Sequence, residues 1–316
     1  MREIGGYIEL DKYTGSMLYD DAVLLNCGRN ALAYLIEARK IRKISLPYFI
    51  CDSVTNVCKK YGLDISYYKI GSDWLPLNLD IGDGEWVYIV NYYGQIEKDI
   101  IARFADIYGK VIVDNAQAYF EKPLNGVDTI YTCRKFFGVS DGSILYTNQK
   151  LGRVLPIDES LNKIRYVLGR FERSASEFYS VASENNDLFD KEDIKRMSKL
   201  TSNLLHAIDY DYVKQRRTEN FRYLHKYLNE INSLDVQCVD GAFMYPLMID
   251  NAQYVKQELL KHKIYIPTLW PNVVEELPHD WLEWKLAANV LPLPCDQRYG
   301  EEEMVYMMEV LLECID

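Results

Sequence analysis

Short β-rich runs alternate with helical segments along the first 150 residues, and this alternation constrains the fold more than any other feature of the chain. The β-rich runs are VLLN, KISLPYF, DISYYKI, WVYIVNYYG and KVIVDNA, and helical segments such as ALAYLIEARKI, SVTNVCKKYG and KDIIARFADIYG separate them. Strands separated by helices of about ten to fifteen residues predict βαβ units. The fold class is therefore α/β, with a mainly parallel central sheet and helices on both faces. Functional groups should gather at the carboxyl ends of its strands.

The rest of the chain predicts a second, smaller unit. Residues 151–230 are helical and charged in composition, which indicates long helices. The last third carries the β-rich segment AFMYPLMI and a final amphipathic helix, EEEMVYMMEVLLECI. Single hydrophobic cores stop growing near roughly 250–300 residues, so a chain of 316 residues should form two lobes. We predict a large domain over residues 1–215 and a small C-terminal α+β domain over residues 216–316.

Charge and hydropathy exclude several kinds of partner. A formal net charge of −11 opposes binding to nucleic acid or to an anionic membrane, because their phosphates would be repelled. No apolar run approaches the roughly 20 residues that span a bilayer. The N-terminal MREIGGYIELDKY lacks the apolar region of a secretory signal. We therefore predict a cytoplasmic protein with no nucleic-acid or membrane partner.

The cysteines and histidines show no pattern of a metal or disulfide site. The seven cysteines are scattered and include no C-x-x-C pair, so we expect reduced thiols. The four histidines have no ligand-like spacing, and no metal site is predicted. His206 and His225 lie in helical stretches and are better explained as packing or surface residues than as catalysts.

Two segments near the middle of the chain carry the strongest chemical signal. VIVDNAQAYF, residues 111–120, and TIYTCRKFFGVSDGSILYT, residues 129–147, place Asp114 and Lys135 at adjacent strand ends. A pyridoxal phosphate enzyme needs this pair: a lysine carries the cofactor as a Schiff base, and a carboxylate keeps the pyridine nitrogen protonated. Taken alone, Asp114 could be a helix N-cap, and Lys135 could be a surface lysine beside Arg134.

Several segments in the same order resemble the DegT/DnrJ/EryC1/StrS aminotransferases, which have the type I pyridoxal phosphate fold. VDNAQA and the lysine segment ending in Asp-Gly resemble that family's central motifs. The similarity extends over most of the chain, through GRNALAYLI, SLPYF, NYYGQ, RMSKLTSNLL and the closing LPLP. The large domain is then expected to bind pyridoxal 5′-phosphate.

The resemblance implies a role for each matching residue. Lys135 would form the Schiff base and later move a proton between substrate and cofactor, a role that suits a lysine with a depressed pKa. Asp114 would pair with the pyridine nitrogen, and Gln117 with the ring hydroxyl. The phosphate would be bound at a helix N-terminus and by a hydroxyl, with contacts from Gly28, Arg29, Asn30 and Thr132. An ordinary strand-to-helix turn would also explain Gly28.

The chain departs from the family pattern at several positions. Arg29 and Asn30 stand where a small residue and Thr are usual, and Cys51 stands where an aromatic ring stacks on the cofactor. Lys135 follows Asp114 by 21 residues, a shorter interval than in most relatives. Residues 140–143, Ser-Asp-Gly-Ser, replace the usual Glu-Gly-Gly. These differences indicate a divergent subgroup.

The resemblance also implies a homodimer, in which a loop of one subunit reaches the cofactor of the other. Arg196-Met197-Ser198 match the start of the helix that follows this loop, and Asn185 or Asn186 could supply the contact. Alternatively, ENNDLFDKED is a solvated acidic segment.

The predicted activity is a pyridoxal phosphate-dependent aminotransferase reaction on a nucleotide-linked keto-sugar, with glutamate or glutamine as amino donor. Aromatic and cationic residues suit a sugar and its phosphates. The candidates for substrate contacts are Tyr92, Tyr93, Trp270 and Arg298, although each could be structural.

Two alternative functions stay open. A sugar dehydratase is opposed by Lys135, since dehydrating relatives carry histidine there. A non-catalytic or regulatory protein is favoured by the missing stacking aromatic and opposed by the complete Asp, Gln and Lys set.

Overall fold

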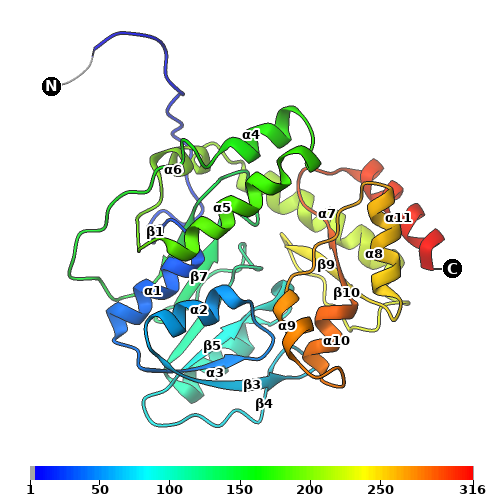
Figure 1. The fold of residues 1–316 in the computed structure, drawn as a ribbon, viewed down its shortest axis with the longest axis horizontal. Coiled ribbons are helices and arrows are strands. Elements are labelled where there is room, and N and C mark those ends of the chain that lie inside the picture. Colours follow the sequence, from blue (N-terminus) through cyan, green and yellow to red (C-terminus); the bar gives the residue numbers. More distant parts are fainter. Residues whose placement is uncertain (1–3, 316) are drawn as a thin grey trace.

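A central sheet of eight strands organises the structure, a computed structural model that describes residues 4–315 (Figure 1). The strand order is β1-β8-β7-β6-β5-β2-β3-β4. All neighbours from β3 to β7 pair in parallel, whereas β8 runs antiparallel to both β7 and β1, and β4 antiparallel to β3. The strands are β1 (Val23–Leu25), β2 (Lys43–Pro47), β3 (Asp64–Ile70), β4 (Pro76–Leu77), β5 (Trp86–Val90), β6 (Val111–Asp114), β7 (Asp128–Thr132) and β8 (Ser143–Tyr146).

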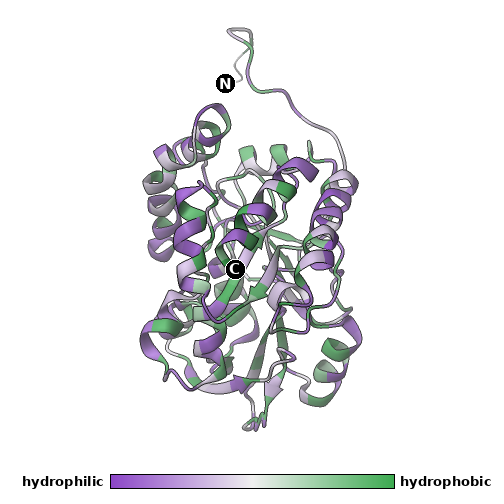
Figure 2. Ribbon diagram, turned by 90° about the vertical axis from the view of Figure 1, so that its right-hand side faces the viewer, coloured by the Kyte–Doolittle hydropathy of each residue, from purple (hydrophilic) through white to green (hydrophobic). Residues whose placement is uncertain are grey.

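Helices cover the sheet because its central strands have no polar face. In β5 and β6 all side chains but the first of β5 and the last of β6 are buried, the pattern expected for parallel strands covered on both sides. Figure 2 shows largely hydrophobic strands in the middle of the molecule, with helices of mixed hydropathy around them. The helices between these strands are α1 (Gly28–Arg39), α2 (Asp52–Lys60), the short 3₁₀ helix η1 (Tyr92–Gly94) and α3 (Lys98–Tyr108). The predicted α/β architecture is confirmed.

A helical segment follows the sheet, but it begins later than the sequence indicates. Residues 147–164 form no helix or strand, and a single isolated β-bridge joins Ile157 to Arg196. Gly152 and Pro156 lie in this stretch, and both residues disfavour a helix interior. The helices that follow are α4 (Arg165–Glu172), the 3₁₀ helix η2 (Ser176–Phe178), α5 (Tyr179–Lys191), α6 (Lys199–Leu205) and α7 (Tyr210–Leu228).

A second sheet of two antiparallel strands forms the centre of the C-terminal lobe, on the right in Figure 1. Its elements are β9 (Met244–Met248), α8 (Ala252–Lys261), α9 (Pro271–Glu276), α10 (Leu282–Asn289), β10 (Val290–Pro294) and α11 (Glu301–Ile315). The proposed division between residues 215 and 216 falls inside α7, so this helix belongs to both lobes.

One buried arginine of α7 joins the two lobes. The guanidinium of Arg217 donates to the Phe136 carbonyl of the large domain at 3.2 Å and to the Ala242 and Phe243 carbonyls of the C-terminal lobe at 2.8 and 3.3 Å. Its Nε also donates to Gln297 Oε1 at 2.8 Å. Burial lowers the pKa of Arg217 to about 10, so the group stays charged at neutral pH with its donors satisfied by neutral oxygens.

The N-terminal segment lies apart from the body of the protein, at the top of Figure 1. Ile4, Tyr7 and Ile8 are almost fully exposed, at 97%, 96% and 91%. The segment is held at its base, where Asn203 of α6 donates to the Asp11 carbonyl and accepts from the Tyr13 N–H.

A buried carboxylate holds the start of β8 against α6. Asp141 is fully buried and accepts hydrogen bonds from the Ser198 N–H and the Ser160 hydroxyl at 2.8 and 2.7 Å. The hydroxyls of Ser198 and Thr201 also donate to it. Among residues 4–315 no cation lies within ion-pair distance of it, so its hydrogen-bond partners are neutral donors, three of them at the N-terminus of α6.

We expect Asp141→Ala to lower the free energy of unfolding by about 3 kcal/mol, because it leaves several buried donors without an acceptor. Urea denaturation would measure the change. Asp83→Ala, at an exposed position, is the matched control and should change stability by less than about 0.5 kcal/mol. Equal midpoints for the two variants would show that the buried carboxylate does not hold α6.

Candidate active site

Asp114 and Lys135 lie at neighbouring strand ends, as the sequence predicts. Asp114 is the last residue of β6 and pairs in parallel register with Ile130 of β7. Lys135 lies in the tight turn that follows β7, where the N–H groups of Phe136 and Phe137 both donate to the Cys133 carbonyl. Both side chains therefore belong to the carboxyl edge of the sheet, where α/β proteins bind ligands.

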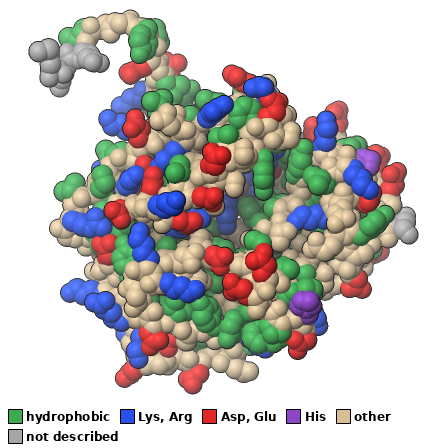
Figure 3. All heavy atoms as spheres, in the orientation of Figure 1, with side chains coloured by type: hydrophobic (Ala, Val, Ile, Leu, Met, Phe, Trp, Pro, Cys, Tyr) green, Lys and Arg blue, Asp and Glu red, His purple; other side chains and the backbone are tan. Residues whose placement is uncertain are grey.

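Lys135 lies in a recess rather than on an open surface. Part of its side chain is exposed, yet protein surrounds the amine closely enough that burial lowers its pKa, against the opposing effect of the Asp114 charge. Its Nζ is 5.4 Å from the centre of the Phe243 ring, which the C-terminal lobe contributes. Figure 3 shows a hollow near the middle of the face that it draws, with Lys or Arg side chains within it. The amine is thus accessible to a ligand and shifted toward its neutral form.

Two neutral donors hold the Asp114 carboxylate. The Ala116 N–H donates to Oδ1 and the Tyr88 hydroxyl donates to Oδ2, each at 2.8 Å. Burial, together with the nearby Asp114 charge, raises the pKa of Tyr88 well above its usual value, so the phenol remains a donor. No motif in the sequence points to Tyr88. Its partner in the β5–β6 register is Ile112, which lies two residues before Asp114 and so faces the same side of the sheet.

Gln117 is oriented by a strained turn after β5. Tyr93 has a positive φ of 53°, which is uncommon for a residue other than glycine. In this conformation its N–H donates to Gln117 Oε1 at 2.8 Å. This bond assigns the orientation of the amide, and the Gln117 NH₂ group has no acceptor among residues 4–315.

The N-terminus of α1 lies beside the end of β7. A Cβ atom on Gly28 would lie 2.9 Å from Thr132 Cγ2, so only glycine allows this approach. The N–H groups of Gly28 and Arg29 have no acceptor among the described residues, as expected for the first turn of a helix. The Thr132 hydroxyl makes only a long contact of 3.4 Å with the Ala116 carbonyl. These groups form a small cradle of donors.

The side chains of Arg29 and Asn30 point to other partners. Arg29 forms an ion pair with Asp190 of α5 at 2.7 Å and contacts Asn186. Asn30 donates to Asn26 Oδ1 and to the Asp193 carbonyl, each at 2.9 Å. Arg29 can therefore contribute its backbone N–H to the cradle, whereas its side chain binds residues of α5.

Asn185 and Asn186 contact residues of their own chain. Asn185 is buried and donates to the Ser140 carbonyl at 3.0 Å, and Asn186 accepts from Arg29. They belong to α5, not to a loop. Ser198 caps α6 by accepting from the Thr201 N–H, so this helix begins where its sequence indicates.

Cys51 lies near Lys135 and Tyr88, at the N-terminus of α2. Its thiol is 2.8 Å from the Ser53 hydroxyl, and a negative charge on it would act on Lys135 and Tyr88. The position is the one expected for the ring-stacking residue, and a polarizable sulfur occupies it.

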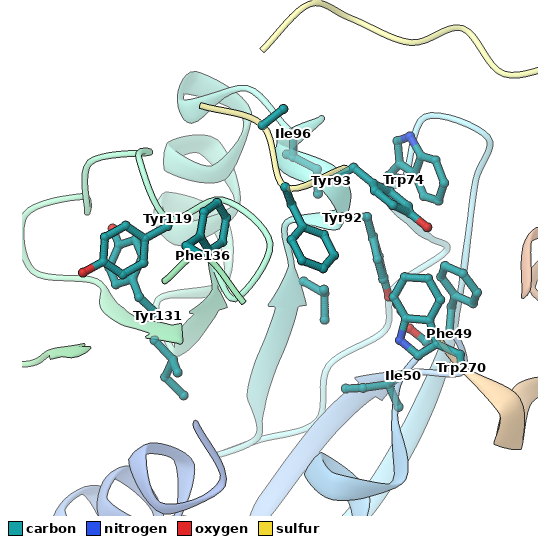
Figure 4. Close-up of a cluster of buried hydrophobic side chains, with 14 of the residues drawn as sticks. Phe49, Ile50, Trp74, Tyr92, Tyr93, Ile96, Tyr119, Tyr131, Phe136 and Trp270 are labelled. Carbon is teal, nitrogen blue, oxygen red and sulfur yellow. Dashed lines mark hydrogen bonds between the residues drawn. The ribbon is translucent and has the colours of Figure 1, made fainter. Parts of the chain in front are cut away.

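Tyr92, Tyr93 and Trp270 form an aromatic cluster with Phe49 and Trp74 (Figure 4). Exposure is 1% for both tyrosines and 6% for Trp270. The Tyr92 hydroxyl donates to the Phe49 carbonyl. The three rings are core residues that join the two lobes, and their contact with a substrate stays a prediction.

Arg298 lies in the C-terminal lobe, and two of its three guanidinium nitrogens bind a carboxylate of the same lobe. Its Nε and Nη2 donate to the two oxygens of Asp296 at 2.6 and 2.7 Å, and its guanidinium lies over the Tyr299 ring. A substrate contact by Arg298 also stays a prediction.

A pocket of about 440 Å³ lies beside Gln117, between η1 and the C-terminal lobe. Its walls combine amide, charged and aromatic side chains, among them Gln95, Gln117, Phe120, Lys214 and Asp240. Lys214 and Asp240 are 3.6 Å apart and both partly exposed, so this ion pair is weak and leaves the ammonium available.

Within residues 4–315, no group of three or more His, Cys, Asp or Glu side chains is arranged to hold a metal ion. All seven cysteines are free thiols. None of the described helices has the length and apolar character to cross a membrane.

Comparisons with known proteins identify the fold. The chain matches no protein-family model and no curated protein. Its structure is similar to the sugar aminotransferase CalS13 from Micromonospora echinospora, with a TM-score of 0.60 and 17% identity over 92% of this chain and 87% of that one. For DesV from S. venezuelae, solved with a ketimine intermediate, the TM-score is 0.65 at 16% identity over 93% and 85%.

NtdA from Bacillus subtilis, solved with the cofactor PMP, gives a TM-score of 0.66 at 14% identity over 93% of this chain and 73% of that one. A DegT DnrJ EryC1 StrS aminotransferase from Brucella abortus is also similar, with a TM-score of 0.64 and 13% identity over 93% and 86%. At these identities the similarity establishes the fold. The chain has the type I fold of these sugar aminotransferases, and the resemblance predicted from the sequence is confirmed at that level.

We expect Asp114→Asn to lower the pKa of Lys135 further, because the negative charge that supports the ammonium form is removed. The neutral amine should then appear at lower pH than in the wild type. The pH dependence of Lys135 acylation, quantified by peptide mass spectrometry with exposed Lys43 as internal standard, would measure the shift.

Tyr88→Phe is the matched variant, since it removes a neutral donor from Asp114 and keeps the carboxylate charge. Its acylation midpoint should stay at or above that of the wild type. If the Asp114→Asn midpoint also stayed there, the electrostatic coupling of Asp114 and Lys135 would be refuted.

Proposed function

We propose that this protein is a pyridoxal phosphate-dependent aminotransferase in which Lys135 holds the cofactor. The observation that carries the proposal is the position of Lys135 beside Asp114 at the carboxyl edge of the sheet, in the fold of sugar aminotransferases. A recessed lysine with a lowered pKa is the amine that carbonyl chemistry requires.

The residues at this edge fit pyridoxal 5′-phosphate. The cradle formed by the Gly28 and Arg29 N–H groups and the Thr132 hydroxyl suits a phosphate. Because a side chain at position 28 would clash with Thr132, glycine leaves the space between them free. The free NH₂ of Gln117 suits the ring oxygen. The Asp114 carboxylate suits the protonated ring nitrogen, and Cys51 lies where a group would cover the ring face.

The chain's own groups have separate tasks. The bound cofactor supplies an electron sink for the bond-breaking step. Lys135 would hold the cofactor and, as a neutral amine, would move a proton at the substrate α-carbon. Tyr88 and Ala116 donate to the Asp114 carboxylate and hold it in place, where it would pair with the protonated ring nitrogen.

We infer that the acceptor is a keto-sugar, nucleotide-linked, and that glutamate or glutamine is the donor. The similar structures are sugar aminotransferases, which supports the sugar. The 440 Å³ pocket beside Gln117 has the size and polar lining that a sugar requires. Its Lys214 ammonium is a cation available to a phosphate of the carrier.

We also infer a homodimer. Large apolar side chains are exposed on the N-terminal segment, at Val154 in the stretch after β8 and at Phe171 of α4, where the exposures are 96% and 90%. Exposed apolar surface of this kind is typical of a protein contact. Asn185 and Asn186 contact their own chain, so we do not assign them to a partner's site.

Borohydride labelling tests the cofactor attachment. Mixing the protein with pyridoxal phosphate should produce a visible absorption band, and reduction should bleach it and leave the label on Lys135. Lys135→Ala should carry no label. A label on another lysine, or no band from folded protein, would remove the basis of the proposal.

Amino-donor assays separate the aminotransferase from the alternatives. Glutamate or glutamine should convert the bound cofactor to its amine form, and Lys135→Ala should slow this step by about 10²–10⁴-fold, the usual contribution of a positioned acid–base group. Binding without any such conversion would favour the non-catalytic alternative, and release of water from a sugar without amination would favour the dehydratase.

Light scattering at micromolar concentration is expected to give twice the chain mass of 36.9 kDa, because the exposed apolar side chains would be covered. A mass equal to one chain would contradict the homodimer.

A further inference from the structure

Arg134, which directly precedes Lys135, has no carboxylate partner. The ion pairs of residues 4–315 do not include it, although burial lowers its pKa. Its Nη2 lies 3.5 Å from Asn186 Oδ1, and its guanidinium lies 4.7 Å from the centre of the Phe189 ring. The Tyr166 phenol also lies beside it. A guanidinium has five N–H donors, and these neutral neighbours leave it without an ion-pair partner among residues 4–315.

The free guanidinium lies next to the N-terminus of α1. Cys27 is the N-cap residue of that helix. Burial raises the pKa of the Cys27 thiol, and the charge of Arg134 opposes this shift more than that of Arg29 does. Arg134 also follows Thr132 by two residues, and Thr132 touches Gly28. The guanidinium therefore adjoins the cradle formed by Gly28, Arg29 N–H and Thr132.

The charges at this place do not balance. Asp190 pairs with Arg29, but among residues 4–315 no carboxylate lies within ion-pair distance of Arg134, and the charge of Asp141 acts on it less than its burial does. The helix N-terminus adds a further positive field. A partly desolvated charge without a counter-charge is unfavourable, so the place is suited to an anion. A tetrahedral dianion uses this donor set better than a carboxylate does, because it presents three oxygens to N–H, O–H and guanidinium groups from different directions.

We propose that Arg134 is a phosphate-binding residue that completes the α1 cradle and binds the phosphate monoester of the cofactor. The identity of the ligand rests on the proposed function, whereas the anion site rests on the arrangement of Arg134, Thr132 and α1. The same turn then presents Lys135 to the reactive end of the ligand and Arg134 to its phosphate.

Calorimetric titration of the cofactor-free protein tests the site with inorganic phosphate, pyridoxal phosphate and pyridoxal. Arg134→Gln should weaken binding of both phosphate compounds by about 10- to 100-fold, the range expected for hydrogen bonds to a charged group. Binding of pyridoxal, which lacks the phosphate, should change by less than about twofold. Arg134→Lys keeps the charge and loses the planar fork, so it should give an intermediate loss.

Arg103→Gln, an exposed substitution in α3, is the matched control and should bind all three compounds like the wild type. If Arg134→Gln does not fold, as judged by circular dichroism, the intermediate loss in Arg134→Lys carries the test. Unchanged phosphate binding in the folded variant, or an equal loss for pyridoxal and its phosphate, would overturn the proposal, as would a wild type that binds no phosphate.

The labelling of Lys135 keeps this test separate from that of the proposed function. Phosphate binding that depends on Arg134, with no label on Lys135, would confirm the anion site and refute the cofactor. A label on Lys135 with phosphate affinity independent of Arg134 would confirm the cofactor and refute the role of Arg134.

Discussion

The buried guanidinium of Arg217 is the interaction on which the arrangement of the site depends. It donates to the carbonyl of Phe136, which follows Lys135, and to the carbonyls of Ala242 and Phe243 at the start of the C-terminal lobe. The Phe243 ring in turn lies beside the Lys135 amine. Since these oxygens are neutral, the bonds satisfy the donors without cancelling the charge, and removal of the guanidinium would leave buried carbonyls unpaired on both lobes. Contacts from both lobes thus fix the position of Lys135.

The electrostatics of the site run against the charge of the whole chain. The protein carries a formal net charge of −11, yet Arg29, Arg134, Lys135 and Arg217 gather around the carboxyl edge of the sheet. Of the acids near Lys135, Asp114 is the one whose charge acts on it most strongly. Local fields in a recess are set by such fixed neighbours rather than by the distant surface, where solvent and salt screen charges. A protein with a net negative charge can therefore still have a local group of cationic side chains that favours an anion. The Asp114 carboxylate acts on Lys135 within the same site.

Much of the fold and part of the site follow from the sequence. The alternation of strands and helices predicts the parallel sheet, and apolar runs that end in Asp114 and before Lys135 predict their meeting at one edge. Tyr88 could not be found in this way, because its contact with Asp114 depends on the register of β5 against β6. Tyr92, Tyr93 and Trp270 have the composition of a sugar site, but their packing into one cluster arises from tertiary contacts between distant segments. Arg217 gave no signal, since a charged residue in a polar helix normally faces water.

The helix α7 crosses from one lobe to the other without a break, from Tyr210 to Leu228. A loop between lobes acts as a hinge because a few backbone torsions can change freely, whereas bending a helix breaks its i to i−4 hydrogen bonds. Rotation of the C-terminal lobe about residues 215 and 216 is therefore disfavoured. The two lobes are therefore expected to move together where α7 joins them. Opening of the recess for a ligand must come from small sliding movements or from side chains and loops at its rim.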